Sequence, residues 1–238
     1  MTAKETTSNR GHSSSLLTKS VFFFLHSLIF SFSLWLILWN GVGLLGSFWG
    51  QSWEIADPMR AKVLLACTFL YWARHAVTLF YLVVRKIPWG EAIGLSFFFA
   101  FFEITLLLAG GGILRDSPTP MRYWDIIALI LLLTGSFLNS GSEIQRKWWK
   151  KNPVNKGHCY TLGLFRHSMH INYFGDLVLF SGWCIFTCSL VTFAIPLLML
   201  IMFVFLHIPD IDLYLAKRYG EEFEAYAQRT KKLIPGIF

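Results

Sequence analysis

The sequence predicts an all-α integral membrane protein with about six transmembrane helices, the last two forming a tight hairpin, and an amphipathic cytoplasmic helix at the C-terminus. Hydrophobic residues make up 55% and aromatic residues 17% of the 238 residues, which is more than a soluble core of this length needs. The apolar residues also occur in runs of about 20, the length at which a helix crosses a bilayer. Both observations exclude a soluble enzyme.

The apolar runs give the expected helices in order. Residues 1–20 are polar and precede an apolar run without an obvious cleavage site, so we expect a tail followed by a retained first helix. The first four spans are expected at Val21 to Leu45, Ala61 to Val84, Ala92 to Leu114 and Trp124 to Ser142. The apolar region 172–207 is too long for one span, and Pro196 with nearby threonines and serine favours a hairpin. Five or six crossings follow.

The basic residues predict the orientation. With six crossings and the N-terminus inside, 16 of the 21 lysines and arginines fall in cytoplasmic segments. Both termini are therefore expected in the cytoplasm, and the net charge of +7 needs no nucleic-acid partner. The four cysteines have neither a disulfide framework nor the spacing of a zinc site, so we expect no metal.

The second and third spans carry polar residues at membrane depth. Tyr71 and Arg74 lie three residues apart on one helical face, with His75 beside Arg74. An arginine in mid-span needs a polar partner, and Glu103 in the next span is the expected one. This pair could be a structural ion pair or part of a substrate site.

Polar residues continue from the fourth span into the cytoplasm. Ser136, Asn139, Ser140 and Glu143 follow helical spacing, and Arg146 lies one turn further on. Glu143 and Arg146 could belong to a site. For the lysines that follow, attraction of anionic membrane lipid is the favoured interpretation; they are Lys147, Lys150 and Lys151.

The stretch "NYFGD" opens the hairpin. Asn172, Tyr173 and Asp176 fall within one helical arc of about 100 degrees. A carboxylate entering a span needs a ligand, an amide or a cation as its partner. The pattern therefore favours a functional role over simple packing.

The C-terminal segment adds a second polar group. Asp212, Tyr219, Phe223 and Tyr226 are expected on one face of a continuous helix. An interfacial amphipathic helix explains the aromatic residues but leaves Asp212 unexplained. Arg229 and the lysines after it could bind a phosphate-bearing ligand or lipid headgroups.

"NYFGD", followed about forty residues later by "DLYLAKRYGEEFEAYAQRTKKLIP", resembles the C-terminal half of a membrane superfamily. This superfamily includes steroid 5α-reductases, sterol reductases and isoprenylcysteine carboxyl methyltransferases. Within it, the chain is most similar to the bacterial steroid 5α-reductase-like proteins. The resemblance covers residues 135–238 well and the first three spans only in general pattern. It implies that cofactor binds from the cytoplasmic side and that the earlier helices shape a lipid-accessible substrate cavity.

The residues favour the reductase branch. Asn172, Tyr173 and Asp176 follow its "NYFGE" or "NYLGD" form, whereas the methyltransferases show "RHPxYxG". His170 is common to both branches, but Met169 and Ile171 replace the arginine and proline that often flank it.

The resemblance implies NADPH-dependent reduction of a carbon-carbon double bond in a lipophilic, steroid- or isoprenoid-like substrate. An S-adenosylmethionine-dependent methyltransferase of a lipid or prenylated substrate and a non-catalytic member of the fold are the alternatives. Glu103 with His75 or Tyr71 is expected to face the substrate. The expected cofactor-binding residues are Glu143, Arg146, Lys156, Arg166, His170, Asn172, Tyr173, Asp176, Asp212, Tyr219, Tyr226 and Arg229.

Three regions follow: the cytoplasmic tail 1–20, the substrate-cavity helices of 21–142, and the cofactor-binding region 143–238. The expected location is a bacterial inner membrane, and membrane lipids are the expected surroundings. The sequence does not specify an oligomeric state.

Overall fold

The computed structural model describes residues 15–113, 115 and 118–238, and these residues form helices and loops without strands. Five helical segments of this part are long and apolar enough to cross a membrane. They are α1 (Leu16–Leu38), α3 with the π-helical turn η1 (Pro58–Leu82), α4 (Trp89–Gly111), α5 (Tyr123–Lys150) and a last segment (Leu190–Tyr219). The predicted all-α, multi-pass membrane fold is confirmed.

A sixth apolar helix, α6 (Ile171–Phe186), lies between α5 and the last segment in the chain. Its 16 residues span about 24 Å, less than the roughly 30 Å of a hydrocarbon core. The last segment comprises η4 (Leu190–Phe193), α7 (Ala194–Met202), η5 (Phe203–His207) and α8 (Ile208–Tyr219), and α9 (Glu221–Arg229) follows it. The remaining short elements are α2 (Gly41–Phe48), η2 (Pro153–Asn155) and η3 (Gly163–Arg166).

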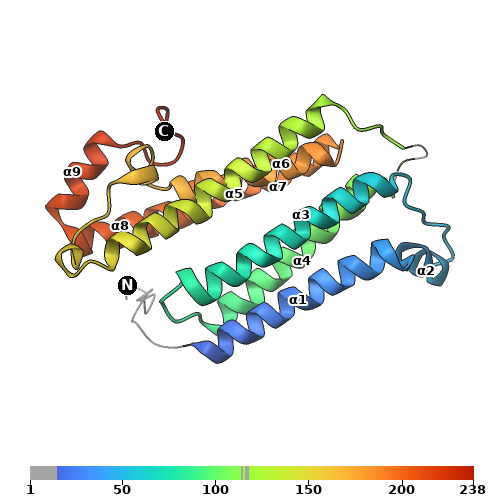
Figure 1. The fold of residues 1–238 in the computed structure, drawn as a ribbon, viewed down its shortest axis with the longest axis horizontal. Helices are drawn as coiled ribbons and strands as arrows, with labels where there is room; N and C mark the ends of the chain where they lie inside the picture. The colour runs from blue at the N-terminus through green and yellow to red at the C-terminus, as the bar shows by residue number, and fades with distance from the viewer. Residues whose placement is uncertain (1–14, 114, 116–117) are drawn as a thin grey trace, which may run out of the picture.

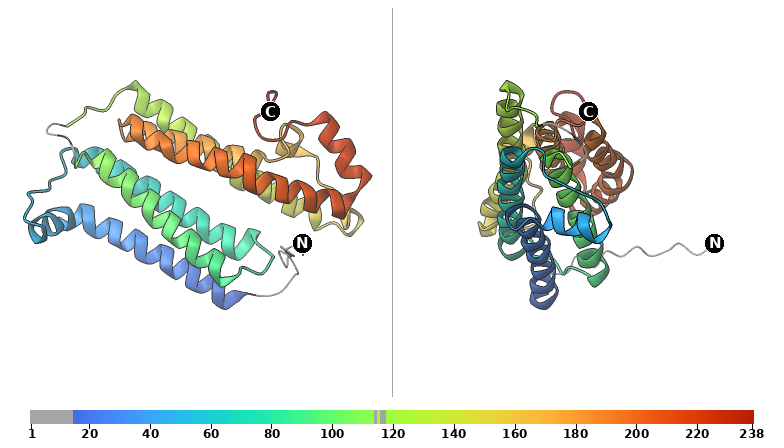
Figure 2. Two further views of the ribbon diagram at one scale, coloured as in Figure 1. Left: turned by 180° about the vertical axis from the view of Figure 1, so that it is seen from behind. Right: turned by 90° about the vertical axis from the view of Figure 1, so that its right-hand side faces the viewer.

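The helices form two groups that lie side by side. α1, α3 and α4 make one group, and α5, α6 and the last segment make the other (Figures 1 and 2). α3 and α4 contact α6, and α5 contacts η1, so these five elements form the boundary between the groups. Buried apolar side chains at this boundary include Leu64, Phe102, Leu132 and Trp183.

Glycines allow α5 and α6 to approach closely. A Cβ atom added to Gly135 would lie 2.3 Å from Leu179 N, and one added to Gly175 would lie 2.5 Å from Asn139 N. Backbone atoms cannot move aside as a flexible side chain does, so both positions require glycine. Small residues commonly bring membrane helices together in this way.

A buried arginine holds the end of the molecule opposite the C-terminus. Arg60 is fully buried, and its Nε donates to Asp57 Oδ2 at 3.2 Å. Its Nη1 bonds to Asp125, at the start of α5, and to Phe186 O, at the end of α6, at 2.9 Å. Because the guanidinium has two carboxylate partners and several carbonyl partners, its burial is compensated. Arg60 therefore ties both helix groups together.

The first and fourth spans differ from their expected bounds. The predicted helix 21–45 is divided by Asn40, whose φ of +53° is left-handed, so α1 ends at Leu38 and α2 begins at Gly41. Asparagine tolerates this conformation better than most residues. The fourth helix continues past Ser142 to Lys150 and carries the basic residues outward from the bundle.

The hairpin is present, but the C-terminal helix is not continuous. α6 is followed by a turn at Cys188, whose φ is +54°, and Pro196 lies in the first turn of α7, where its missing N–H costs nothing. The prediction of one helix through Asp212 and Tyr226 is wrong. Gly220, with φ +53° and ψ −127°, separates α8 from α9.

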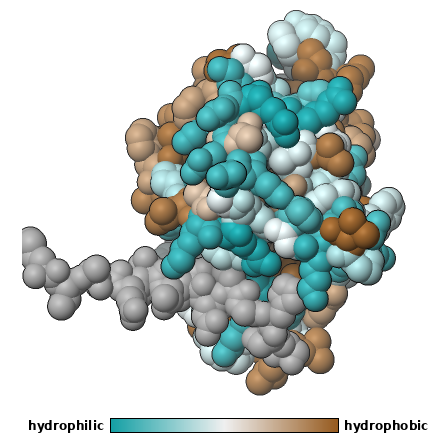
Figure 3. All heavy atoms as spheres, turned by 90° about the vertical axis from the view of Figure 1, so that its left-hand side faces the viewer, coloured by the Kyte–Doolittle hydropathy of each residue, from teal (hydrophilic) through white to brown (hydrophobic). Residues whose placement is uncertain are grey.

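The two ends of the bundle differ in polarity. The start of α1, the loop after η1, the loop 151–170 and the C-terminal helices lie at the same end (Figure 1). Figure 3 looks onto this end, and hydrophilic residues cover much of it. We call it the polar end. It brings the described start of the first helix and the C-terminus to one side, as the sequence predicts.

Candidate functional site

An ion pair between Arg74 and Asp176 joins the two helix groups at membrane depth. Arg74 Nη2, on α3, donates to Asp176 Oδ1, on α6, at 3.1 Å. Only 11% of the Arg74 side chain and 19% of the Asp176 side chain are exposed. The prediction that Glu103 is the partner of Arg74 is wrong, because α6 supplies the opposing carboxylate and Glu103 contacts α1.

Glu103 belongs to a separate buried group with two histidines. Its Oε1 lies 2.7 Å from His26 Nε2, and His26 Nδ1 lies 2.7 Å from His75 Nδ1. Each of these contacts requires one donor and one acceptor, so the tautomer of one histidine determines that of the other. The rings of Phe22 and Phe99 pack around the histidines. Sequence analysis missed His26, because one histidine in a long apolar run forms no pattern.

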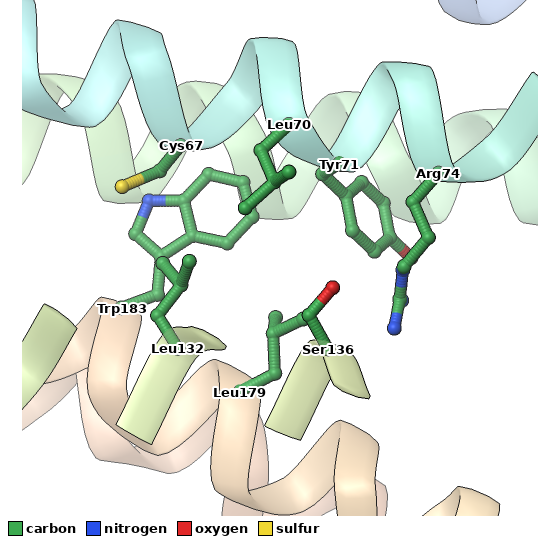
Figure 4. Close-up of a pocket in the computed structure, with 8 residues that line it drawn as sticks. All are labelled: Cys67, Leu70, Tyr71, Arg74, Leu132, Ser136, Leu179 and Trp183. Carbon is green, nitrogen blue, oxygen red and sulfur yellow. The ribbon is translucent and has the colours of Figure 1, made fainter. Parts of the chain in front are cut away.

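A narrow pocket, too tight to hold a water molecule in this structure, lies at the boundary between the helix groups, beside Arg74 (Figure 4). Tyr71 lies beside Arg74 in this wall, with the guanidinium carbon 4.9 Å from the centre of the Tyr71 ring. Arg74 Nη1 is buried and has no hydrogen-bond partner among the described residues. The other lining residues are Cys67, Leu70, Leu132, Ser136, Leu179 and Trp183. The pocket is therefore apolar except at Tyr71, Arg74 and Ser136.

The three predicted substrate-facing residues separate in the structure. Tyr71 lines the pocket, whereas Glu103 and His75 are absent from its lining and are buried among α1, α3 and α4. His75 follows Arg74 directly on α3, so the Glu103 group can fix the rotation of that helix. Of the three, only Tyr71 is in a position to contact a ligand in this pocket.

A chain of hydrogen bonds leads from Asp176 towards the polar end. Asn139 Nδ2 lies 3.0 Å from Asp176 Oδ2 and 3.1 Å from Asn172 O. Asn172 Nδ2 donates to Glu143 Oε1 at 3.2 Å, and Arg146 bonds to the other oxygen of Glu143. Four of the predicted cofactor-binding residues, Glu143, Arg146, Asn172 and Asp176, are therefore linked through Asn139.

A wider groove of about 420 Å³ runs along the outer face of α5. Leu70 and Ser136 line both this groove and the pocket beside Arg74, so the two spaces adjoin. Ser140 also lines the groove, and its buried hydroxyl has no hydrogen-bond partner among the described residues. The walls are otherwise mainly apolar and lead from membrane depth to Trp148. An apolar molecule can therefore reach the pocket region from the side of the bundle.

The start of α6 carries a second charged group. His170 Nε2 lies 2.9 Å from Asp212 Oδ1 on α8, and Lys232 Nζ lies 3.3 Å from Asp212 Oδ2. The ring of Tyr173 stacks between those of His170 and Phe203, at centroid distances of 5.7 and 4.5 Å. The structure thus brings Asp212 to His170, which lies 42 residues earlier in the chain and stacks on Tyr173.

The polar end is closed by the loop 151–170, α9 and the C-terminal residues. Met169 N donates to Lys231 O at 2.8 Å, and Tyr226 OH donates to Phe165 O at 2.5 Å. Burial raises the pKa of Tyr226 above its usual range. Tyr226 therefore stays protonated and supports the fold of this region.

Other predicted residues lie around the same closure. Tyr219 OH accepts from Lys150 Nζ at 3.1 Å, and Arg229 Nη2 donates to Thr161 Oγ1 at 3.4 Å. Lys156 and Arg166 are exposed on the loop 151–170. Tyr219, Arg229, Lys156 and Arg166 do not lie around Asn172. The predicted cofactor-binding residues therefore divide into two groups, one beside α6 and one in the segments that close the polar end.

A family model described as "Protein of unknown function (DUF1295)" matches residues 85–230, more than half of the chain. The chain belongs to the DUF1295 family. This family is related to the steroid 5α-reductase-like proteins. The match contains Asn139, Asn172 and Asp176 but begins after the helix that carries Tyr71 and Arg74.

Among characterised proteins, this DUF1295 protein is similar to one named "Probable O-methyltransferase ustE" from Ustilaginoidea virens. The two sequences are 35% identical over 95 residues, which are 38% of this chain. The match spans only 33% of the relative. Together with the family, this relative fits a fold of the membrane reductase and methyltransferase type.

Proposed function

We propose that the protein is a membrane-embedded, NADPH-dependent reductase of a carbon-carbon double bond in a lipophilic, steroid- or isoprenoid-like substrate. The main support is the continuous polar chain from Arg146 at the polar end to the Arg74–Asp176 pair beside the pocket. It adjoins both the cofactor-binding region implied by the resemblance and a mainly apolar pocket open towards the lipid-facing groove. Such a site can receive a polar cofactor and an apolar substrate from different directions.

The residues beside α6 fit a dinucleotide cofactor. Asn172 and Glu143 supply amide and carboxylate groups that suit ribose hydroxyls, and the flat ring of Tyr173 suits a base. Arg146 is partly exposed, and its guanidinium fork suits a phosphate. His170, Asp212, Tyr219, Tyr226 and Arg229 would hold the loop and helices around the cofactor, with Lys156 and Arg166 at the surface.

NADPH, when bound, supplies the hydride for the reduction. Tyr71 would donate a hydrogen bond to the carbonyl oxygen conjugated with the double bond. As negative charge develops on that oxygen, Arg74 would stabilise it and Tyr71 would give it a proton to form the enol. Tautomerisation would then move a proton to the carbon beside the carbonyl, and solvent would return a proton to Tyr71. Asp176 would hold Arg74 in place. The apolar walls would exclude water from the reacting atoms.

Glu103 and His75 would then act as positioning residues. They are bonded through His26 and adjoin Arg74 along α3, so they would fix the orientation of Tyr71 and Arg74. Variants that break these contacts are expected to lower kcat and the melting temperature together, with little change in NADPH affinity. A direct catalytic role would require either side chain to reach the pocket.

A methyltransferase is the second candidate, and the relative named a probable O-methyltransferase favours it. Methyl transfer from S-adenosylmethionine to an oxygen releases a proton and needs a base. The Arg74–Asp176 pair would then orient the substrate, and Asp176 would accept the proton. S-adenosylmethionine has a sulfonium centre and no phosphate, so it has no use for phosphate-binding arginines.

Ligand-dependent thermal unfolding of the full chain in nanodiscs separates these functions. A ligand that binds only the folded protein raises its melting temperature. NADPH is expected to do so and S-adenosylmethionine is not, and Asn172→Ala should reduce the NADPH effect. Gln228→Ala, on the exposed face of α9, is the control. Stabilisation by S-adenosylmethionine alone would replace the reductase with the methyltransferase, and a response to neither would favour a non-catalytic role.

The proposed location is a bacterial inner membrane with both termini in the cytoplasm. The polar end carries the start of α1 and the C-terminus, and most lysines and arginines lie in segments at this end. Positive charge near membrane helices favours the cytoplasmic side. NADPH would therefore reach the site from the cytoplasm, and membrane lipids would surround the helices.

A further inference from the structure

Three basic side chains from three different elements meet at the end of η1. Lys19 Nζ, on α1, donates to Val83 O at 2.5 Å. Lys147 Nζ, on α5, bonds to Tyr81 O and lies 3.9 Å from the centre of the Tyr81 ring. Arg85 lies two residues after Val83, and the Lys19 ammonium is close enough to both Arg85 and Lys147 for their charges to repel. We call Lys19, Arg85 and Lys147 the basic triad.

The triad has more positive charge than its surroundings compensate. Arg85 forms an ion pair with Glu91, and among the described residues neither Lys19 nor Lys147 has a carboxylate partner. The lysines bond to neutral carbonyl oxygens. Two positive charges therefore remain close to a third, and such repulsion is relieved when an anion binds among them.

Capping of a helix end explains part of this arrangement. Lysines commonly bond to the last carbonyl groups of a helix. One helix end, however, does not require cations from α1 and α5 together with a neighbouring arginine. Each ammonium group has three donors and uses one for the carbonyl bond described above. The remaining donors can meet the oxygens of a tetrahedral anion.

The triad also borders the proposed cofactor site. Lys147 lies four residues after Glu143, on the same face of α5. Trp148 Nε1 donates to Tyr81 OH at 3.0 Å, which holds the aromatic wall beside Lys147. All three triad side chains are partly exposed, so a ligand can reach them.

We propose that Lys19, Arg85 and Lys147 form a binding site for a phosphate group at the polar end of the protein. The group belongs either to the NADPH of the proposed function, on which this assignment rests, or to an anionic lipid headgroup. Three cations from separate elements suit the oxygens of one phosphate. The triad differs from the basic residues predicted from sequence, of which Lys156 and Arg166 are exposed on the loop 151–170 and Arg229 contacts Thr161.

The test uses the full chain in nanodiscs of phosphatidylcholine, a lipid without net charge. The triple variant Lys19→Gln/Arg85→Gln/Lys147→Gln removes the triad, and Lys147→Gln alone keeps the test valid if the triple variant does not fold. The control, Lys151→Gln/Lys217→Gln/Lys231→Gln, removes the same charge from exposed positions. Thermal unfolding is measured against added NADPH and, separately, in nanodiscs that contain phosphatidylglycerol.

The triple variant is expected to lose about ten-fold or more in NADPH affinity, because several charge-assisted contacts disappear. The control should stay within about two-fold of the natural protein, because distant exposed charges are screened by salt. Stabilisation by phosphatidylglycerol alone, lost in the triple variant, would assign the site to a lipid headgroup and contradict the reductase. If NADPH raises the melting temperature of the natural protein and of the triple variant equally, the triad does not bind the phosphate, and the proposed function stands. No response to either probe would overturn both.

Discussion

Arg74 on α3 and Asp176 on α6 form an ion pair across the boundary between the two helix groups, with 3.1 Å between Nη2 and Oδ1. Asn139 on α5 bonds to the second carboxylate oxygen at 3.0 Å. One aspartate thus joins three helices. Because the Arg74 guanidinium also lines the pocket, the same contact that joins the groups sets the polar wall of the candidate site.

Removing one partner of this ion pair should lower the free energy of unfolding more than removing both partners. Asp176→Ala leaves a largely buried guanidinium unpaired and is expected to lower the free energy of unfolding by about 3 kcal/mol. The double variant Arg74→Met/Asp176→Leu should regain most of this stability. Denaturant titration in mild detergent measures both, with the exposed Asp210→Ala as control. Additive effects of the two single changes would contradict a direct pair.

The buried group of Glu103, His26 and His75 predicts that its variants lose different amounts of stability. His26→Leu leaves Glu103 Oε1 and His75 Nδ1 without partners and should cost about 2 kcal/mol. Glu103→Gln keeps an oxygen that accepts from His26, so its cost should be below about 1 kcal/mol. Thermal unfolding ranks the two variants. If Glu103→Gln abolishes turnover at an unchanged melting temperature and unchanged NADPH affinity, Glu103 contacts the substrate and the positioning role is wrong.

The close approach of α5 and α6 makes Gly175 sensitive to substitution. In Gly175→Ala, the new methyl group would meet Asn139 N at 2.5 Å and Gly135 O at 2.8 Å, so the helices must separate. The expected loss of stability is about 1 to 3 kcal/mol, with a smaller NADPH-induced shift because Asn139 moves away from Asp176.

Gly94→Ala on α4 is the matched control, since nothing lies within 4 Å of its added Cβ. It should leave stability unchanged or raise it by up to about 1 kcal/mol, because alanine favours the helix over glycine. Equal effects of the two changes would mean that close packing of α5 and α6 does not contribute to stability.

The orientation can be tested with reporters. An enzyme that is active only outside the cell should be silent when fused after Phe238, because the polar end is expected in the cytoplasm. The same reporter inserted after Gly50, between α2 and α3 at the opposite end, should be active. The reverse pattern would place the polar end, and with it the proposed cofactor site, outside the cell.

The class of protein and most of its helices could be predicted from sequence because they depend on local properties. Apolar runs of bilayer length specify spans wherever they occur, and α3, α4 and α5 begin within three residues of their expected positions. The arc of Asn172, Tyr173 and Asp176 also follows from the period of one helix. These statements require no knowledge of which helices are neighbours.

The tertiary structure decided which polar residues meet. Helical period gives the face on which Arg74 lies, but it does not tell whether α4 or α6 lies opposite that face. The fold supplies Asp176 to Arg74 and His26 to Glu103, and it brings Lys19 to Lys147 across more than a hundred residues. Burial sets these partnerships, because a charge withdrawn from water requires whichever polar group the packing of the helices brings within reach.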